Sequence, residues 1–417
     1  MKDTRRMDAT NVERAAARLQ GVARRTPLES SERLSSELGV SVLLKREDLQ
    51  IGRSYKVRGA YNLISSLSDA ERRRGVICAS AGNHAQGVAY SSRRLQIECR
   101  IFVPTTTPRQ KCERIRAIGG QSVELTLIGT TYDETSAAAL AEGKRSGAIY
   151  VHPFDDERTI AGQGTVAIEV FEQCPEVTTV IVPVGGGGLI AGVALWTKDR
   201  FPAARIIGAE PAGAASMAAA LDKGKPTALS MIDTFVDGAS VAQVGALTFP
   251  LVRDLVDEVV EVPDGAVCTE MLDLYQTEGI IAEPAGALAS AALRRCIAPI
   301  AGGVVVCIVS GGNNDVSRYG EVVERSLLHE GLRHYFLVTF PQEPGALRRF
   351  LDEVLSDKED IVVFEYVKKN NRETGPALIG IDLDSSDRLD GLLRRMALSP
   401  LQIERIPPGS PLFSFML

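Results

Sequence analysis

Tryptophan, histidine and paired cysteines are scarce in this 417-residue sequence, which contains one Trp, four His and seven Cys. With so few histidines and no H-E-x-x-H motif, a zinc site has little support, and we expect no metal. The cysteines form no C-x-x-C pair, and several lie in apolar runs. They are therefore predicted to be small buried residues in a reducing compartment.

Long runs of one charge are also missing. The 47 basic and 53 acidic residues leave a formal net charge of -6. No basic tail is long enough to indicate binding to a polyanion. We therefore expect no nucleic-acid partner.

An uninterrupted apolar helix of membrane length is absent as well. Residues 177–197 carry no charge, but Pro183 and four glycines in their middle predict a strand, a turn and then a helix. No apolar core follows the basic N-terminus, so no signal peptide is expected. The run from Thr10 to Glu13 instead predicts a capping box that opens a helix. We expect a cytoplasmic protein with no membrane partner.

Up to about residue 320, short Val/Ile-rich runs alternate with helical patterns. Runs without apolar/polar alternation are typical of strands buried on both faces, so the pattern predicts an α/β fold with mostly parallel sheets. The number of strands favours two lobes with a cleft between them. The predicted strands are residues 42–44, 76–79, 100–103, 149–152, 180–184, 205–208, 259–262 and 304–309.

The pattern changes after Glu330. Strands are predicted at 334–340, 361–367, 377–383 and 401–406, and helices at 344–355 and 389–396. This order, β-α-β-β-α-β, is the ferredoxin-like pattern.

Two segments carry candidate chemistry in the first half of the chain. Lys56 lies in a predicted helix, and on its own a solvated surface lysine is the favoured interpretation, since a functional lysine needs a Schiff-base partner or a similar reason. The segment from Ser80 to Gly87 follows a buried strand and opens a helix. Its N–H groups form a candidate anion site. Simple N-capping by Ser80 or Asn83 is slightly favoured for this segment alone.

Two further segments follow buried strands in the second half. The four consecutive glycines Gly185, Gly186, Gly187 and Gly188, with Leu189 after them, lie between a strand and a helix. Such a loop brings main-chain N–H groups close to an anion, and we favour phosphate binding over a merely flexible loop. Neither a Walker A lysine nor a complete G-x-G-x-x-G motif is present, which argues against a nucleotide loop. Ser310 also follows a strand, where a simple turn is the alternative.

Taken in order, these segments resemble the fold-type II pyridoxal-phosphate enzymes, whose catalytic region is a two-lobed, tryptophan synthase β-like α/β fold. The nearest group is the biosynthetic threonine ammonia-lyases (threonine dehydratases) with one C-terminal ACT-like regulatory domain. The resemblance implies a catalytic domain at 1–320 with its smaller lobe at about 53–150, a linker at 321–332 and a regulatory domain at 333–417. The matching segments are 45–50, 54–60, 79–87, 152–156, 161–165, 185–189, 282–287 and 310–313.

This resemblance implies a role for each site residue. Lys56 holds pyridoxal 5'-phosphate covalently and moves the substrate α-proton. Asn83 contacts the ring hydroxyl oxygen, and Ser310 contacts the ring nitrogen. The phosphate is held by Gly185, Gly186, Gly187, Gly188 and Leu189. The substrate carboxylate is held by Ser80, Ala81, Gly82, Asn83 and His84.

The implied reaction converts L-threonine to 2-oxobutanoate and ammonia, the committed step of isoleucine biosynthesis. Isoleucine is then the expected inhibitor, bound at the C-terminal domain near the turn at 340–347, and valine is a candidate opposing effector. A purely structural role in assembly is the alternative for that domain. A homotetramer is expected by resemblance alone.

Several rival activities stay open. Some serine racemases have a serine where this chain has Ala81, which cannot supply an acid or base, so racemisation is disfavoured. Those relatives bind a metal near the position of Glu210, but here Ser216 replaces a third ligand. A catabolic serine/threonine dehydratase and a β-replacement enzyme also stay open, whereas the intact motifs argue against a non-catalytic amino-acid sensor. The preference for threonine over serine is not readable from these residues, nor is the role of Glu283.

Overall fold

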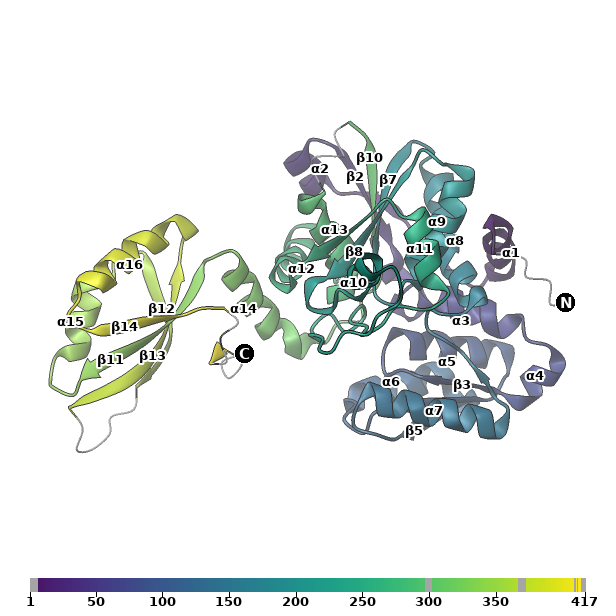
Figure 1. Cartoon of the computed structure of the whole chain (residues 1–417), viewed down its shortest axis with the longest axis horizontal. Helices are drawn as coiled ribbons and strands as arrows, with labels where there is room; N and C mark the ends of the chain where they lie inside the picture. The colour runs from purple at the N-terminus through teal and green to yellow at the C-terminus, as the bar shows by residue number, and fades with distance from the viewer. Residues whose placement is uncertain (1–6, 297–301, 367–372, 409, 411, 414–417) are drawn as a thin grey trace. The chain divides into compact units, whose positions relative to one another are not determined.

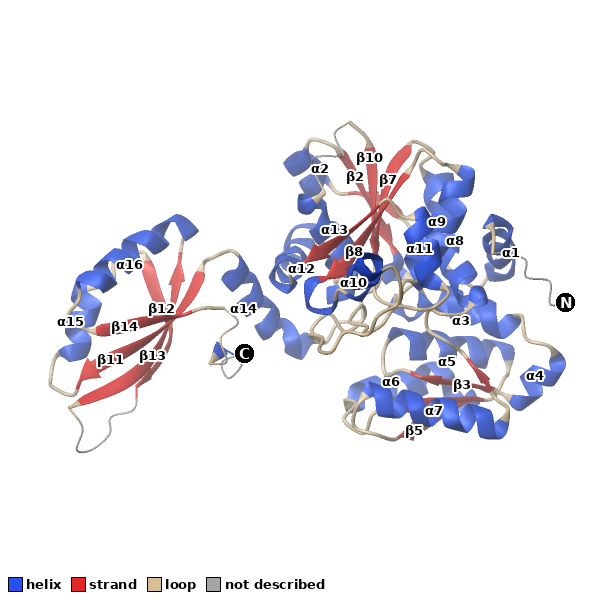
Figure 2. Cartoon of the chain, in the orientation of Figure 1, coloured by secondary structure: helices blue, strands red, loops and turns tan. Residues whose placement is uncertain are grey.

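The computed structural model describes residues 7–296, 302–366, 373–408, 410, 412 and 413. The chain divides into two compact units, Met1–Asp315 and Val316–Leu417 (Figure 1). Helices and strands alternate along the first unit (Figure 2). Within the described residues, no helix is both long and apolar enough to cross a membrane.

Six strands form the large sheet of the first unit: β1 (Leu28–Ser30), β2 (Ser41–Arg46), β7 (Val177–Pro183), β8 (Arg205–Pro211), β9 (Glu258–Val262) and β10 (Val304–Val309). Their spatial order is β1-β2-β10-β7-β8-β9. β1 runs antiparallel to β2, and all other neighbours are parallel. β7, β8 and β10 are buried along almost their whole length, as expected for strands covered on both faces.

Helices cover both faces of this sheet. Figure 1 shows α8 (Glu157–Gln173) and α9 (Gly188–Arg200) on one side, and α12 (Asp264–Glu278) and α13 (Pro284–Ala292) on the other. α9 is buried from Gly188 to Thr197, and its side chains join the largest core cluster. The remaining helices of this region are α1 (Ala9–Leu19), α2 (Glu32–Leu38), α10 (Ser216–Lys223) and α11 (Thr248–Leu255).

A second, four-stranded sheet comprises β3 (Val76–Ala79), β4 (Cys99–Val103), β5 (Val123–Leu127) and β6 (Ile149–Tyr150). All its strands are parallel, in the order β5-β4-β3-β6. The helices around it are α3 (Lys56–Ser65), α4 (Asp69–Arg74), α5 (Asn83–Leu95), α6 (Arg109–Gly119) and α7 (Tyr132–Ser146). The carboxyl end of β3 leads directly to the N-terminus of α5, which places the Ser80–His84 segment at the edge where ligands bind in parallel sheets.

The second unit begins with α14 (Tyr319–His329). It continues as β11 (Arg333–Pro341), α15 (Ala346–Glu353), β12 (Glu359–Tyr366), β13 (Thr374–Leu383), α16 (Leu389–Leu398) and β14 (Gln402–Ile406). The sheet is antiparallel with the order β12-β13-β11-β14. Phe336, Phe340, Phe350 and Ile379 are buried between this sheet and its helices. The predicted α/β fold class and the βαββαβ order are both confirmed.

Some local predictions were wrong. α1 is capped by Asp8, whose side chain accepts from Thr10 N, so the predicted capping box at Thr10–Glu13 is displaced by two residues. β6 ends at Tyr150 because the His152 ring turns back to accept the N–H of Asp155 at 2.8 Å. β1 and β5 were not predicted, being short or lying at a sheet edge. The last residue of the strand predicted at 361–367 lies outside the described residues.

Candidate active site

Lys56 is the first residue of α3 and lies where several segments meet. Its Nζ donates to the carbonyl oxygen of Pro153 at 3.2 Å. The preceding Tyr55 N–H donates to the Ser310 carbonyl at 3.3 Å. Ser54 bridges to Gly311. The start of α3 is thus held against the end of β10, and the amine against the 152–156 segment, both of which are distant from Lys56 along the chain.

Beneath Lys56, α3 is anchored by a buried set of charges. Arg58 donates to both oxygens of Glu47, with Nη2–Oε1 at 2.7 Å, and also to Glu169 at 2.7 Å. Lys45 Nζ donates to the other oxygen of Glu169 at 2.7 Å. Two cations and two carboxylates balance, so each charge of this set has a partner of opposite sign. This network fixes the first turn of α3.

The tetraglycine loop joins β7 to α9. The main-chain N–H groups of Gly185, Gly186, Gly187, Gly188 and Leu189 find no acceptor within the described part of the chain. Gly187 has φ of 90°, a conformation that favours glycine. Free N–H groups at the N-terminus of a buried helix are a ready anion site.

Phe154 links this loop to the lysine. A methyl group on Gly186 would lie 2.4 Å from the Phe154 ring, so only glycine fits there. Pro153, the residue before it, accepts hydrogen bonds from both Lys56 and Gln163 Nε2, the latter at 3.0 Å. The Gln163 Oε1 atom is buried, has no partner among the described residues, and would lie 2.6 Å from a methyl group on Gly188. The lysine amine and the anion loop therefore border one site.

The Ser80–His84 segment forms the start of α5. Ser80 Oγ accepts from Gly82 N at 3.2 Å, and the N–H groups of Ala81, Asn83 and His84 find no acceptor in the described chain. His84 is buried, and its Nε2 contacts the Val151 carbonyl at 2.8 Å. Burial and the nearby Lys56 lower the pKa of His84 to about 3. The imidazole is neutral, and its Nδ1 is without a partner among the described residues.

Ser310 and Asn83 complete the site from two different elements. Ser310 is buried at the end of β10, and its hydroxyl donates to the Ala285 carbonyl at 3.0 Å. A hydroxyl also offers two lone pairs and can rotate, so it remains able to face a ring nitrogen. Asn83 Nδ2 donates to Glu283 Oε1 at 2.6 Å, and Asn83 Oδ1 accepts from Asn313 Nδ2 at 2.5 Å. These bonds tie the predicted site residues of both sheets to one another.

Residues 19–311 match the family model described as pyridoxal-phosphate dependent enzyme, and residues 324–416 match the C-terminal regulatory domain of threonine dehydratase. The chain is 56% identical over 415 residues to the L-threonine dehydratase biosynthetic IlvA of Mycobacterium bovis, covering 99% of this chain and 96% of that protein. It is similar to the solved processed form of threonine deaminase isoform 2 from Solanum lycopersicum, with TM-score 0.74, 43% identity, and coverage of 76% and 88%. Maize serine racemase matches with TM-score 0.71, 35% identity, and coverage of 77% and 98%.

The fold and the matched model define a pyridoxal-phosphate-dependent enzyme. Within that class, the chain belongs to the biosynthetic threonine dehydratase family, including that family's C-terminal regulatory domain. The resemblance drawn from the sequence motifs is confirmed, and so is the cofactor.

The residues present fit this cofactor. Free N–H groups at Gly185–Leu189 suit a phosphate, and the Lys56 amine suits an aldehyde. Ser310 and Asn83 offer neutral polar groups for the ring. Three of the eight buried side-chain atoms without a partner in the described chain, on Gln163, His84 and Asn313, lie among these same residues.

A metal centre is not formed by the described residues, since no group of three or more His, Cys, Asp or Glu side chains is close enough together. Glu210 is buried, and its two oxygens accept from Met217 N at 2.6 Å and Ala218 N at 2.9 Å. Burial raises the pKa of Glu210 to about 7. The carboxyl group thus caps α10, with each of its oxygens accepting a main-chain N–H.

Sequence reasoning did not identify several residues of the site: Asn313, Gln163 and Phe154 received no individual role, and that of Glu283 stayed open. Each lies within a segment that matched the family, but their contacts span separations of up to 261 residues. The one available signal was the position of Asn313 directly after the Ser310-Gly311-Gly312 turn.

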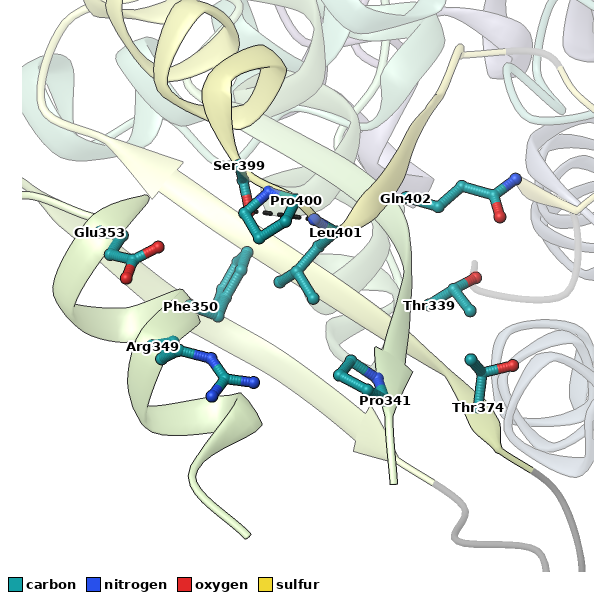
Figure 3. A pocket seen from close by; sticks show the side chains of 10 residues that line it. All are labelled: Thr339, Pro341, Arg349, Phe350, Glu353, Thr374, Ser399, Pro400, Leu401 and Gln402. Carbon is teal, nitrogen blue, oxygen red and sulfur yellow. Dashed lines mark hydrogen bonds between the residues drawn. The ribbon is translucent and has the colours of Figure 1, made fainter. Parts of the chain in front are cut away.

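The second unit has a hollow of about 330 Å³ between α15 and the chain leading into β14 (Figure 3). Arg349 and Glu353 border it on α15, and the buried Phe350 and the partly buried Leu401 form its apolar part. Thr339, Thr374 and Ser399 add hydroxyl groups. Another hollow, of about 410 Å³, is bordered by the turn at 340–347 and by Arg348.

Proposed function

We propose that this chain is a threonine ammonia-lyase, which dehydrates and deaminates L-threonine to 2-oxobutanoate and ammonia. The observation that carries the proposal is the meeting of the Lys56 amine and the free N–H groups of Gly185–Leu189 at the Pro153–Phe154 segment. The names of the Mycobacterium bovis and Solanum lycopersicum relatives support threonine as the substrate.

Each residue has a defined task in this reaction. When bound, pyridoxal phosphate supplies an electron sink that makes the substrate α-proton acidic. Lys56 would hold the cofactor until the substrate amine displaces its Nζ, which would then be free to take that proton. The N–H groups of Ala81, Asn83 and His84 would hold the substrate carboxylate, and neutral His84 adds no positive charge there. Ser310 would offer the ring nitrogen a neutral hydroxyl in place of a carboxylate, which would favour prompt loss of the β-hydroxyl. The released enamine would take up water and give 2-oxobutanoate and ammonia.

The test is ketoacid formation from threonine and from serine by the pyridoxal-phosphate-loaded protein. We expect ketoacid from threonine, none from the Lys56→Ala variant, and loss of visible cofactor absorbance in that variant. Lys223→Ala, at an exposed position of α10, is the control and should behave as wild type. Absence of ketoacid from wild type, or D-serine formation instead, would contradict the proposal and favour racemisation.

We further propose that isoleucine inhibits the enzyme by binding the second unit at the hollow in Figure 3, with valine as an opposing effector. A free amino acid needs a cation for its carboxylate, an anion for its ammonium group and an apolar wall. Arg349 offers the cation, although it also pairs with Glu343, Glu353 offers the anion, and Phe350 with Leu401 offers the wall. Feedback requires isoleucine to bind two states of the enzyme unequally. If saturating isoleucine leaves the threonine saturation curve unmoved, this part of the proposal fails.

We also infer a cytoplasmic homotetramer made of a catalytic domain at 1–320, a linker at 321–332 and a regulatory domain at 333–417. The cysteines of the described chain are all free thiols, in keeping with a reducing compartment. Light scattering of the loaded protein tests the assembly, for which a mass near four times 44.8 kDa is expected.

A further inference from the structure

A closed set of hydrogen bonds joins three segments around Asn83. Asn83 begins α5, Glu283 precedes α13, and Asn313 follows β10. Asn83 Nδ2 donates to Glu283 Oε1 at 2.6 Å, Asn313 N donates to Glu283 Oε2 at 3.2 Å, and Asn313 Nδ2 donates to Asn83 Oδ1 at 2.5 Å. Glu283 is 4% exposed, so this set is closed off from solvent on the Glu283 side.

The donors and acceptors of this set of hydrogen bonds can be assigned in only one way. An ionised carboxylate accepts and cannot donate, so the atom of Asn83 that faces Glu283 must be the NH₂ group. The Asn83 oxygen then faces the donor of Asn313. Rotating the Asn83 amide by half a turn would place NH₂ against NH₂ on one side and oxygen against carboxylate on the other. Of the two N–H bonds of Asn83 Nδ2, one is used by Glu283 and one is left.

We propose that Glu283 is a positioning residue that orients the Asn83 amide, so that its remaining N–H is presented to the ring oxygen of the cofactor. This inference rests on the proposed contact between Asn83 and that ring. An N–H donor there stabilises the ring oxygen as an anion, and Glu283 achieves this through Asn83 without touching the cofactor.

The orientation depends on the ionisation of Glu283. Burial and the nearby Asp237 raise the pKa of Glu283 to about 7, while Asn83, Asn313 and Lys111 oppose the rise. Lys111 and Asp237 face Glu283 from neighbouring elements and form an ion pair at 3.2 Å. Two further charged side chains, Arg53 and Asp48, lie next to Gly312. Below pH 7, protonated Glu283 turns one acceptor oxygen into a donor, and its hold on the Asn83 NH₂ weakens.

Substitutions in the Lys111–Asp237 ion pair at the surface test the proposal without changing a residue of the site. We expect the visible spectrum of bound pyridoxal phosphate to change with pH, with a midpoint near 7. Asp237→Asn removes a negative charge and should move the midpoint down, whereas Lys111→Met removes a positive charge and should move it up, each by about half a pH unit. A midpoint that both variants leave unmoved, or a spectrum independent of pH from 5.5 to 8.5, overturns the proposal.

A direct variant adds a second readout. Glu283→Gln cannot accept from both Asn83 and Asn313, so we expect the pH transition to vanish and the Kd for pyridoxal phosphate to rise about ten-fold or more. Glu270→Gln is the matched control, because Glu270 is an equally buried carboxylate that pairs with Arg33 instead. It should keep the transition and the affinity. If Glu283→Gln does not fold, Asp237→Asn and Lys111→Met still test the proposal.

Failure of this inference is distinguishable from failure of the proposed function. Spectra and cofactor affinity require no turnover. Opposite midpoint shifts in a protein that makes no ketoacid would support the role of Glu283 and reject the activity. Ketoacid formation with unmoved midpoints would support the activity and reject the role of Glu283.

Discussion

Arg58 and Glu47 form an ion pair with Nη2 2.7 Å from Oε1, and their side chains are 1% and 0% exposed. Such a pair contributes little net stability when complete, since desolvation offsets the attraction, but removing one partner leaves an uncompensated buried charge. Arg58 lies two residues after Lys56 on α3, so the network also fixes the position of the amine.

Replacing Arg58 by Met should therefore destabilise the first unit by about 3–5 kcal/mol, because Glu47 and Glu169 each lose a partner. Urea unfolding followed by near-UV circular dichroism measures the change. Arg25→Met removes the exposed pair with Glu172, whose side chains are 56% and 53% exposed, and should cost about 1 kcal/mol or less. Equal losses in the two variants would argue against a special role for burial.

Gly186→Ala should weaken pyridoxal phosphate binding and lower the unfolding free energy by about 1–3 kcal/mol, since the added methyl group meets the Phe154 ring at 2.4 Å. Equilibrium dialysis against the cofactor and thermal melting measure the two effects. Gly320→Ala is the control, because a methyl group there meets nothing within 4 Å. Wild-type affinity in Gly186→Ala would mean that Phe154 moves aside without disturbing the loop.

Acid should destabilise the protein through His84. Its folded-state pKa of about 3 lies below the unfolded value of 6.5, so the unfolded chain binds the proton first. Stability is therefore full above pH 6.5 and falls as pH decreases toward 3, by at most about 1.4 kcal/mol per pH unit from this residue. His84→Gln, which retains a donor for Val151, should flatten the fall in melting temperature between pH 7 and 5. His329→Gln, at an exposed position of α14, should leave this fall in melting temperature unchanged.

Arg349→Ala should weaken isoleucine inhibition about ten-fold or more by removing a partner for the effector carboxylate. The inhibition constant at fixed threonine measures it. Arg348→Ala is the matched control, since this neighbouring arginine borders the other hollow. If Arg348→Ala has the larger effect, the effector site is at the 340–347 turn instead.

Much of the fold was readable from the sequence because its signals are local. Continuous Val/Ile runs gave β3 and β10 their observed bounds, and the glycines between β7 and α9 gave the turn. The sequence of β5, V-E-L-T-L, does alternate, but its edge position depends on which strands pair. α15 begins two residues later than predicted because Gly345 adopts φ of 88°.

The site was readable only as separate segments. The glycine loop and the Ser80–His84 turn carry their anion-binding character in a few consecutive residues. The partnership of Asn83 with Glu283 does not, since 200 residues separate them and a glutamate before a proline is as well explained by packing. Folding brings the two together, and no spacing rule predicts that.

The seven cysteines all belong to the first unit, and the second has none. Six of them are buried, in both sheets and their helices, while Cys174 is partly exposed. Burial raises the pKa of Cys78 and Cys307, which further slows their reaction with alkylating agents. Isotope-coded alkylation during gentle heating would therefore measure the rate of unfolding of the first unit alone, because the second unit has no thiol to react. Labelling of Cys78 and of Cys307 would report separately on its two sheets.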